Sequence, residues 1–451
     1  MAAGAAGGLP NAKNQPPAVF MNLTPEQIAQ GRRNFLKALA GTPALAALGA
    51  ATAMKGPVRG GPVRVGFLGV GGQGRALLTN VDPAFADVRA LCDINPTSLK
   101  RADEVLAKNK MPSAKHYADY REMLQKEDIE AVIMAPPLGF HDDLAVACLD
   151  AGKHVLCEKM MAHDVPGCER MRDAALKNNK VLEIGYQRNY NALYNSTYEG
   201  IIRSGTLGDI FHIRLAWHRN GNWRRKGEPP SPNFDPSPWG YPTFEHLLNW
   251  RLYWQYSQGL MAELASHQVN AVNWFLGSKP EAVVASGGLF RFADGQREVY
   301  DHVYATFEYP QGRTAVFSSI ESNAFDDYYE MYMGTKGTLI ILRETDALLF
   351  DEGSAAQRTV VETTPRTSGP AVETSETMPG NRNTSAAAPA TGDPGARPNV
   401  RPLSTRTEIQ RFCSAVRVGT PLACGPDKAI ESARACIAAN EAIKQKKRLA
   451  I

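Results

Sequence analysis

A glycine-rich turn between a short apolar run and an amphipathic stretch most constrains what this chain can fold into. Residues 63–68 read V-R-V-G-F-L, residues 69–74 read G-V-G-G-Q-G, and an amphipathic stretch follows over 75–81. This is G-x-G-x-x-G between an expected strand and an expected helix, the arrangement that places a dinucleotide pyrophosphate on a helix N-terminus. Asp93 ends the next apolar run, where such sites place an acidic residue.

Each position of this turn has a physical role. The first glycine permits the tight turn, the second lets the backbone approach the pyrophosphate, and the third allows close contact between helix and strand. The Asp93 carboxylate can accept hydrogen bonds from both ribose hydroxyls and would repel a 2′-phosphate, so NAD(H) is favoured over NADP(H). The plain alternative is a glycine-rich turn with a capping Asp. The candidate cofactor contacts are Gly69, Gly71, Gly72, Gln73, Gly74 and Asp93.

Apolar runs alternate with amphipathic stretches over residues 60–184. That alternation predicts an α/β Rossmann domain with a parallel, doubly wound sheet. Pro136 follows one apolar run at the carboxyl edge of this sheet, where ligands of such folds bind, and His141 opens the next helix. Both are candidate cofactor contacts, although His141 also suits a polar position at a helix start.

The sequence changes in character after residue 185. Its 451 residues exceed what one core needs. Later runs alternate apolar and polar side chains, as strands with one covered face do. Residues 185–451 are therefore expected to form an α+β substrate and oligomerisation domain with a large open, mostly antiparallel sheet, covered by helices near 259–276 and the C-terminus. A Ser-, Thr-, Pro-, Ala- and Gly-rich stretch at about 353–403 is interpreted as a low-complexity insertion.

Residues 1–53 are expected to be a targeting segment that does not belong to the folded domains. Arg32 and Arg33 precede a weakly apolar stretch that closes on A-T-A, a small-residue cleavage pattern. Together these features predict a twin-arginine export signal and a periplasmic or secreted protein. The stretch is too short and too mildly apolar for stable membrane insertion. The alternative is a disordered arm with a chance arginine pair, and Met21 competes with Met1 as the start.

Charge and cysteine content exclude several classes of protein. The formal net charge is +4, of which +3 lies before residue 54, so the remainder is near neutral. Nucleic-acid binders need clustered cations, so no nucleic-acid partner is expected. Seven cysteines without CxxC spacing do not form a disulfide framework or a zinc site, and no metal is expected.

Four segments in order resemble the glucose–fructose oxidoreductase / inositol dehydrogenase / rhizopine catabolism (Gfo/Idh/MocA) family. They are the strand edge at 135–136, G-K-H-V-L-C-E-K at 152–159, G-Y-Q-R at 185–188 and G-L-M-A-E-L-A-S-H at 259–267. The resemblance covers roughly residues 60–350 and the C-terminal helices. It implies a Rossmann domain joined to an open-sheet domain, a carbohydrate or polyol substrate, and a homo-oligomer, either dimer or tetramer.

The same resemblance implies where the reaction occurs. Lys159 would be the catalytic lysine, Glu158 would contact the nicotinamide ribose, and His267 would be the acid/base histidine. A histidine can take a hydroxyl proton, and a lysine can stabilise developing negative charge on the oxygen. Glu263 stands where an Asp is usual. It lies four residues before His267, so on a helix it would share a face with the imidazole and could orient it.

Three residues depart from the family pattern. Met160 replaces the proline after Glu-Lys, so the local backbone restraint, which can be a cis bond, is expected to be absent. Glu263 moves its carboxylate by one methylene, and Asn270 stands where a second Asp is usual. These departures leave the acid/base assignment open, and net dehydrogenation with it.

All six tryptophans lie between Trp217 and Trp274. Flat aromatic faces beside Arg and Asn donors suit a polyhydroxylated ligand, although these tryptophans can equally build a core or a subunit interface. A phosphate clamp at 224–226 is a less favoured use of this segment. The candidate substrate contacts are Arg188, Tyr190, Trp217, His218 and Trp223.

Three functions fit these observations. The first is an exported NAD(H)-dependent oxidoreductase that acts on a hydroxyl of a sugar, sugar derivative or polyol. The second is a redox-neutral glycoside hydrolase, lyase or epimerase that keeps NAD tightly bound and works through a transient keto-sugar; the export signal and the altered carboxylate motif favour it. The third, a non-catalytic sugar-binding module, is least favoured because Lys159 and His267 are both present.

Overall fold

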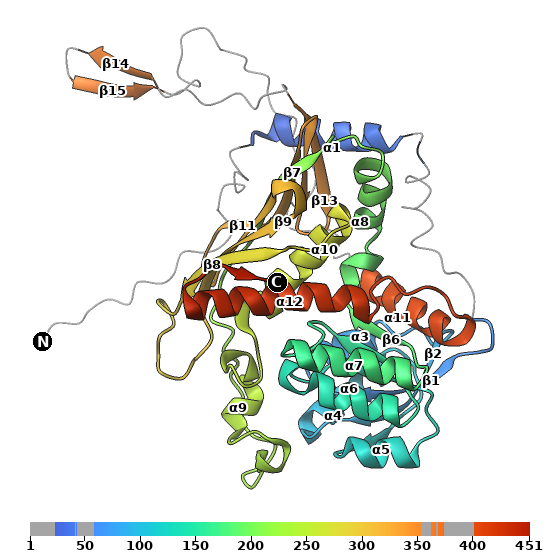
Figure 1. Cartoon of the computed structure of the whole chain (residues 1–451). Coiled ribbons are helices and arrows are strands. Elements are labelled where there is room, and N and C mark those ends of the chain that lie inside the picture. The colour runs from blue at the N-terminus through green and yellow to red at the C-terminus, as the bar shows by residue number, and fades with distance from the viewer. Residues whose placement is uncertain (1–22, 41, 43–57, 353–361, 367–368, 374–400) are drawn as a thin grey trace, which may run out of the picture.

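A computed structural model describes residues 23–40, 42, 58–352, 362–366, 369–373 and 401–451. Two sheets organise these residues, and the long C-terminal helix lies alongside both of them (Figure 1).

The first sheet has six parallel strands in the order β3-β2-β1-β4-β5-β6. Alternate residues of β4 enter different cores, since Val132 and Met134 join one apolar cluster while Ala131 and Ile133 join the other. The expected Rossmann sheet is therefore confirmed. Its strands are β1 (Val63–Leu68), β2 (Ala86–Cys92), β3 (Lys115–Tyr117), β4 (Ala131–Met134), β5 (His154–Glu158) and β6 (Leu182–Gly185).

Helices cover both faces of this sheet. The side chains of Asn95, Asp119 and Asp164 accept hydrogen bonds from backbone N–H groups two or three residues on, which fixes where three of these helices begin. The helices are α3 (Gly72–Thr79), α4 (Pro96–Lys108), α5 (Tyr120–Lys126), α6 (His141–Asp150) and α7 (Val165–Lys177), with the short 3₁₀ turn η3 (Leu138–Phe140) before α6.

The second sheet has eight strands in the order β13-β12-β11-β7-β10-β9-β8-β16. The β7–β10 pair is parallel and the other pairs are antiparallel, so the expected mostly antiparallel sheet is confirmed. Its strands are β7 (Ile210–Asn220), β8 (Ala282–Gly288), β9 (His302–Tyr309), β10 (Arg313–Ile320), β11 (Ser322–Gly334), β12 (Gly337–Leu342), β13 (Asp346–Asp351) and β16 (Leu449–Ala450).

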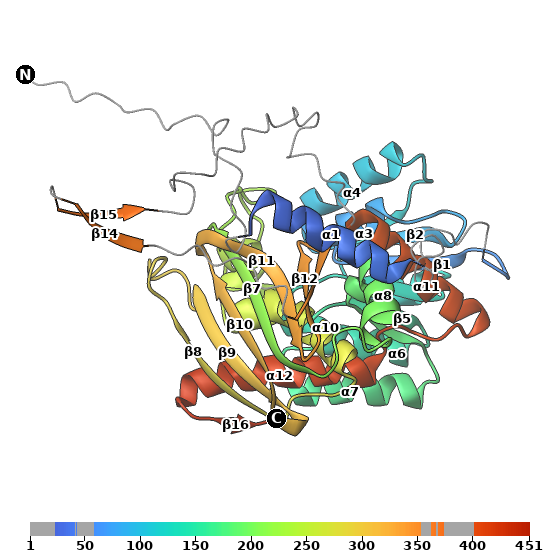
Figure 2. The same ribbon diagram turned by 90° about the horizontal axis from the view of Figure 1, so that it is seen from above.

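Helices pack between and beside the two sheets. Helix α12 (Pro426–Gln445) contacts α7, α10 (Ser266–Leu276) and β8, so it ties the two halves together (Figures 1 and 2). The remaining helical segments are α8 (Ala192–Thr197), α9 (Phe244–Leu248), α11 (Arg401–Val418), the π-helices η5 (Tyr198–Ile202) and η8 (Met261–Ala265), and the 3₁₀ turns η4 (Gln187–Tyr190), η6 (Ser237–Trp239), η7 (Trp250–Leu252) and η9 (Pro310–Gly312).

Helix α1 (Pro25–Leu39) carries the twin arginines and packs on the second sheet beside β13. Thr24 caps it, and Arg32 forms an ion pair with Asp346. A Cβ at Gly31 would lie 2.8 Å from Phe350 and 2.9 Å from Leu348, so glycine permits this close approach. Residues 1–53, which were expected to be only a targeting segment, therefore contribute one helix to the described fold.

Replacing Phe35 by Ala tests whether α1 packs on the sheet in solution. Phe35 is 4% exposed within the main core, whereas its neighbour Leu36 is 57% exposed. We expect Phe35→Ala to destabilise the protein by about 3 kcal/mol and Leu36→Ala to change stability little. Denaturant unfolding of both variants gives the comparison, and equal effects would contradict the packing of α1.

Two expected segments fall largely outside the described residues. The A-T-A pattern, Met1 and Met21 all do. Within the expected insertion at 353–403, strands β14 (Glu362–Arg366) and β15 (Gly369–Glu373) form a hairpin, α11 begins at Arg401, and the rest lies outside.

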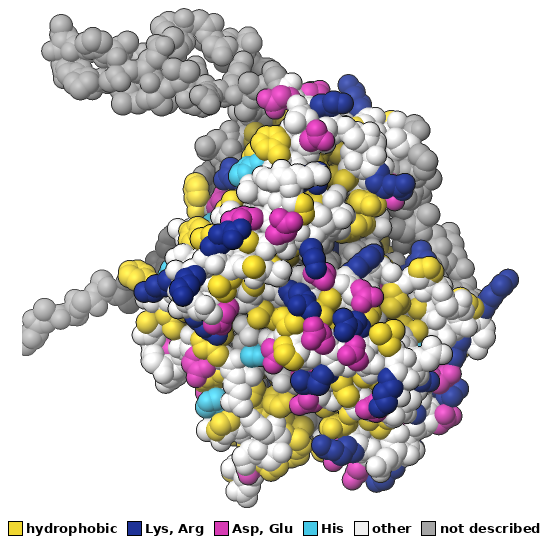
Figure 3. Space-filling view, in the orientation of Figure 1, with side chains coloured by type: hydrophobic (Ala, Val, Ile, Leu, Met, Phe, Trp, Pro, Cys, Tyr) yellow, Lys and Arg dark blue, Asp and Glu magenta, His cyan; other side chains and the backbone are white. Residues whose placement is uncertain are grey.

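The surface and the helices bear on partners. Acidic and basic side chains are interspersed over the face shown in Figure 3. Of the helices that the structure describes, none has the length and hydropathy to cross a bilayer. In the same described ranges, no group of three or more His, Cys, Asp or Glu side chains is placed to hold a metal ion.

Candidate functional site

A cleft of about 1490 Å³ opens between the carboxyl edge of the parallel sheet and the second domain. It brings together most of the residues expected from the sequence, although they come from segments far apart in the chain. Those lining it are Gly69, Gly71, Gly72, Gln73, Asp93, Pro136, His141, Glu158, Lys159, Trp217, Trp223, Glu263 and His267.

The glycine-rich turn has the shape that a dinucleotide requires. Gly69 has φ 81°, and a Cβ at Gly74 would lie 2.0 Å from the Gly69 carbonyl oxygen, so both positions need glycine. Gly74 thus packs behind the turn. By contrast, a Cβ at Gly71 or Gly72 would meet no atom within 4 Å. The backbone there faces open space at the start of α3, where N–H groups can receive a pyrophosphate.

Asp93 lies beside this turn at the end of β2. Its carboxylate accepts hydrogen bonds from the N–H groups of Val70 at 2.9 Å and Asn95 at 2.8 Å, which hold it in place. Burial raises the pKa of Asp93 to about 6, while those two N–H donors lower it in part. The residues of the turn and Asp93 together fit an adenine-side ribose and a pyrophosphate.

Glu158, the last residue of β5, and Lys159, which follows it, both line the cleft. Glu158 accepts a hydrogen bond from the Gln73 side chain at 2.6 Å, which links this segment to the glycine-rich turn. His141 has its ring nitrogens 2.8 Å from the Met160 carbonyl oxygen and 3.1 Å from that of Pro136, and burial lowers its pKa. His141 therefore connects two cleft-lining backbones. The bond between Lys159 and Met160 is cis, so the expected absence of that feature was wrong.

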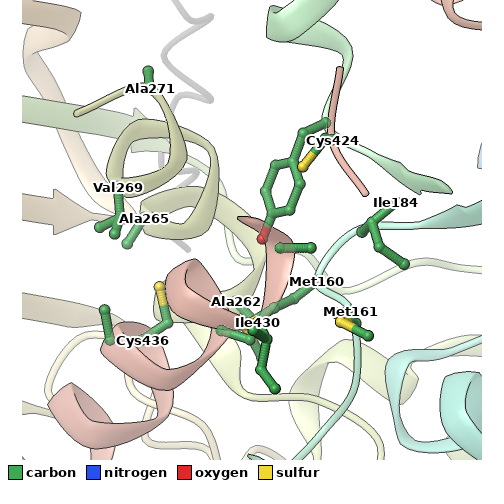
Figure 4. Packing of buried hydrophobic residues seen from close by; sticks show 14 of the residues in the cluster. Met160, Met161, Ile184, Ala262, Ala265, Val269, Ala271, Cys424, Ile430 and Cys436 are labelled. Carbon is green, nitrogen blue, oxygen red and sulfur yellow. The ribbon is translucent and has the colours of Figure 1, made fainter. Parts of the chain in front are cut away.

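An apolar core holds this segment against the second domain (Figure 4). Met160 and Met161 approach Ala262 of η8 and Ile430 of α12 in this view. All four side chains are at most 3% exposed. Because such cores are close-packed, the backbone positions of Lys159 and of η8 are fixed relative to each other.

Lys159 and Glu263 form the polar centre of the cleft. The Lys159 ammonium donates to the carbonyl oxygens of Glu263 at 3.1 Å and Ala262 at 3.4 Å, and lies 3.9 Å from the Glu263 carboxylate. The Arg251 guanidinium donates to that carboxylate at 2.8 Å. Burial would raise the pKa of Glu263, but Arg251 and Lys159 outweigh it and hold the pKa at about 2. The two neighbouring cations therefore favour the ionised form of Glu263.

His267 is the second residue of α10, two residues after η8 ends. Its ring is 5.8 Å from the Trp217 ring, and Trp217 stacks on Tyr328 at 4.1 Å. Trp217, Tyr328 and His267 thus form one wall of the cleft, opposite the glycine-rich turn. Trp223 also lines the cleft.

Three expected substrate contacts do not line the cleft. Arg188 is 1% exposed and pairs with Glu330 and Glu344, which come from the second sheet and the turn after β12. Tyr190 donates to the buried Glu183. His218 alternates with Trp217 along β7 and bonds Ser318. The structure thus places these three residues outside the cleft lining. The partners of Arg188 and His218 lie at least 100 residues away along the chain, whereas Glu183 lies only 7 residues before Tyr190.

Asn270, the third departure from the family pattern, lies outside the cleft lining. It accepts a hydrogen bond from Asn189 at 2.9 Å and donates to Ser432 at 3.1 Å, so it joins α10 to η4 and α12. Arg219 lines the cleft, two positions after Trp217 on the same strand face and within the aromatic segment whose Arg and Asn donors were expected near a ligand. Arg251 also lines the cleft, and sequence reasoning missed it because nothing local marked it.

Comparison with known families decides the relationship. A model of the oxidoreductase family with an NAD-binding Rossmann fold matches residues 63–186, and a GFO/IDH/MocA C-terminal domain matches residues 197–340. The chain belongs to the GFO/IDH/MocA family. It is accordingly an enzyme of an oxidoreductase family, with a Rossmann domain of the NAD-binding kind.

Two curated relatives and one solved structure illustrate this GFO/IDH/MocA membership. The myo-inositol 2-dehydrogenase of Thermotoga maritima is 23% identical over 298 residues, covering 64% of this chain and 79% of that protein. The alpha-N-acetylgalactosaminidase of Shewanella oneidensis is 30% identical over 186 residues, or 36% of this chain and 39% of that protein. The scyllo-inositol dehydrogenase of Lactobacillus casei, crystallised with NAD(H) and scyllo-inositol, matches in fold with TM-score 0.60 at 18% identity, covering 86% of this chain and 99% of that one.

Proposed function

We propose that this protein is an NAD(H)-dependent oxidoreductase that acts on a hydroxyl of a sugar, sugar derivative or polyol. One observation carries the proposal: Lys159 and His267 line the same cleft as the glycine-rich turn. The inositol dehydrogenases among its relatives and fold neighbours act on polyol hydroxyls, which supports this substrate class.

In this proposal the chain's own residues handle the proton and orient the substrate. Gly71, Gly72 and Asp93 would hold NAD, which would supply the acceptor for the hydride that leaves the carbinol carbon as the alcohol is oxidised to a ketone. His267 takes the hydroxyl proton as that hydride leaves. Lys159 donates a hydrogen bond to the same oxygen and stabilises its developing negative charge. Glu263, held as an anion by Arg251, keeps the Lys159 ammonium at the wall of the cleft.

A redox-neutral variant of this chemistry is the second candidate. The relatives of the glycosyl hydrolase type are 28–30% identical to this chain over 186 residues, which favours it. In that variant a transient ketone acidifies the neighbouring C–H bond, a substituent is lost and replaced by water, and the hydride is then returned. Reduced cofactor would not accumulate.

Cofactor analysis separates the two candidates. Protein purified without added nucleotide is denatured, and released NAD(H) is quantified by mass spectrometry before and after incubation with polyols, aldoses and aryl glycosides. Net oxidation predicts NADH in amounts that exceed the enzyme. Redox-neutral chemistry predicts about one bound NAD(H) per chain, glycoside cleavage and no net NADH. Absence of both products, with NAD bound, would contradict the proposed function.

We also propose that Asp93 selects NAD over NADP, and its pKa makes that testable. The ionised carboxylate of Asp93 can accept hydrogen bonds from both ribose hydroxyls, whereas the protonated acid cannot. NAD affinity should therefore weaken as the pH falls through about 6. We expect the Kd for NAD to rise several-fold between about pH 7 and about pH 5. Asp93→Asn should bind NAD more weakly at neutral pH, with little pH dependence. A flat profile in the unsubstituted protein would contradict this role.

Export through the twin-arginine pathway is a further proposal, supported by Arg32, Arg33 and the A-T-A pattern. In the described structure Arg32 pairs with Asp346, whereas Arg33 is exposed. Fractionation of cells that express the protein and its Arg32→Lys/Arg33→Lys variant tests the proposal. Retention of the variant, but not of the parent, in the cytoplasm would support it, and equal distribution would contradict it.

A further inference from the structure

The wall of the cleft formed by the second domain carries more positive than negative charge. Five cations line it, namely Arg219, Arg225, Lys226, Arg251 and Arg343, against two carboxylates, Glu263 and Glu344. Both carboxylates are already matched, since Glu263 pairs with Arg251 and Glu344 pairs with the buried Arg188. Arg343 pairs with Asp327. Three cations are thus left facing the cleft without a carboxylate partner among the described residues.

Arg219 is the best placed of these three cations. Its guanidinium lies 5.4 Å from the Trp223 ring and 5.7 Å from the Trp217 ring, so two aromatic faces hold it in position. Among the described residues no carboxylate lies within the 4.0 Å of an ion pair. Two carboxylates act on it at longer range, and each has a nearer cation: Glu321 pairs with Arg297, and Glu263 pairs with Arg251. Burial lowers the pKa of Arg219, which indicates that the cation is held where water compensates it poorly.

Arg225 is held toward the same space by a buried amide. The Asn249 side chain, 3% exposed as a residue, accepts from the Arg225 backbone N–H at 2.6 Å and donates to its carbonyl oxygen at 3.1 Å. The neighbouring Arg224 takes the other direction, since it pairs with Glu245 and donates to the Gln296 carbonyl oxygen at 3.0 Å. The side chains of these consecutive arginines therefore diverge: Arg225 lines the cleft, and Arg224 pairs with residues at the surface of the second domain.

We infer that the substrate of this site carries an oxyanion substituent, a carboxylate or a phosphate, that binds Arg219 with help from Arg225. The inference rests on the proposed function and specifies its substrate class as an anionic sugar derivative. Trp217 contacts both the His267 ring and Arg219, so it joins the reacting end of the cleft to the anion site. A guanidinium fork binds carboxylate and phosphate oxygens in pairs, and in a partly desolvated cleft such contacts are strong. The substrate would thus place its hydroxyl at His267 and its anionic group across the Trp217 ring.

Calorimetric titration of the NAD-loaded protein tests the inference without requiring turnover. The probes are glucose, glucuronate and glucose 6-phosphate, with inorganic phosphate as a fourth ligand. We expect an anionic sugar to bind about ten- to a hundredfold more tightly than glucose, and the preference to weaken as salt is added. A preference for glucuronate identifies a carboxylate, and a preference for glucose 6-phosphate identifies a phosphate.

Two substitutions on one strand provide the comparison. Arg219→Gln should remove the preference for the anionic sugar and leave NAD affinity unchanged. Arg214→Gln removes the same charge from the same strand at an exposed position outside the cleft, and should preserve the preference. Equal binding of neutral and anionic sugars, or an Arg219→Gln variant that keeps the preference, would overturn the inference. If only neutral sugars were turned over, the proposed oxidoreductase function would stand and the anion site would be refuted. If anionic sugars bound through Arg219 but were not turned over, the anion site would stand and only the proposed function would be overturned.

Discussion

Replacing Lys159 by Met lowers kcat by a factor of about 10²–10³ and leaves the Kd for NAD almost unchanged. Met keeps the unbranched side chain up to the position of Cε and removes the ammonium that, in the proposed mechanism, donates to the reacting oxygen. The Glu263 carboxylate keeps its partner Arg251, so the site should stay folded. Steady-state kinetics with the substrate found in the cofactor assay, together with NAD titration, measures both quantities.

Lys153→Met is the matched control for this substitution. Lys153 precedes β5, donates to the Ile129 carbonyl oxygen at 2.9 Å and does not line the cleft. Removing its charge should leave kcat within about twofold of the parent, as for substitutions away from a site. If Lys159→Met turned over substrate like Lys153→Met, the catalytic role of Lys159 would be refuted.

Replacing His267 by Asn lowers kcat by a factor of about 10²–10⁴ and changes the shape of its pH profile. If His267 is the base, we expect kcat of the parent to rise with pH, because only neutral imidazole can take the hydroxyl proton. Asn cannot titrate, so this rising limb should disappear at saturating NAD and substrate. A structural role for His267 would lower activity at every pH without removing the limb.

His218→Asn offers the corresponding control for His267. His218 alternates with Trp217 on β7, faces Ser318 and lies outside the cleft lining. The variant should retain both the rate and the rising limb. Loss of the limb in this variant would mean that the titrating group of the parent is not His267.

The parts of the site that could be predicted from the sequence are those formed by residues that lie next to one another in the chain. The turn at 69–74 with Asp93, and the Glu158–Lys159 pair at the end of β5, depend on local strand–turn–helix geometry. A motif and its flanking pattern are therefore enough to place them. The parallel sheet follows for the same reason, since most of its strands are short and largely apolar, whereas the exposed edge strand β3 is not.

The parts that could not be predicted depend on pairings between distant residues. Arg188 was expected at the substrate, yet its carboxylate partners lie 142 and 156 residues further along the chain. The Trp217–Tyr328 wall likewise depends on the register between β7 and β11. Helix α1 was not predicted, because its arginines were interpreted only as part of an export signal. Gly31 and Phe35 also suit a packed helix.

Following the carbinol hydrogen tests the central claim most directly. A substrate labelled with deuterium at the reacting carbon is incubated with the NAD-loaded protein, and the cofactor and product are examined by mass spectrometry. We expect deuterium to pass to the nicotinamide in the parent, and the label to slow this step. Lys159→Met and His267→Asn should each greatly reduce the transfer. Product formed while the deuterium stays on its carbon, with no label ever reaching the cofactor, would contradict this expectation.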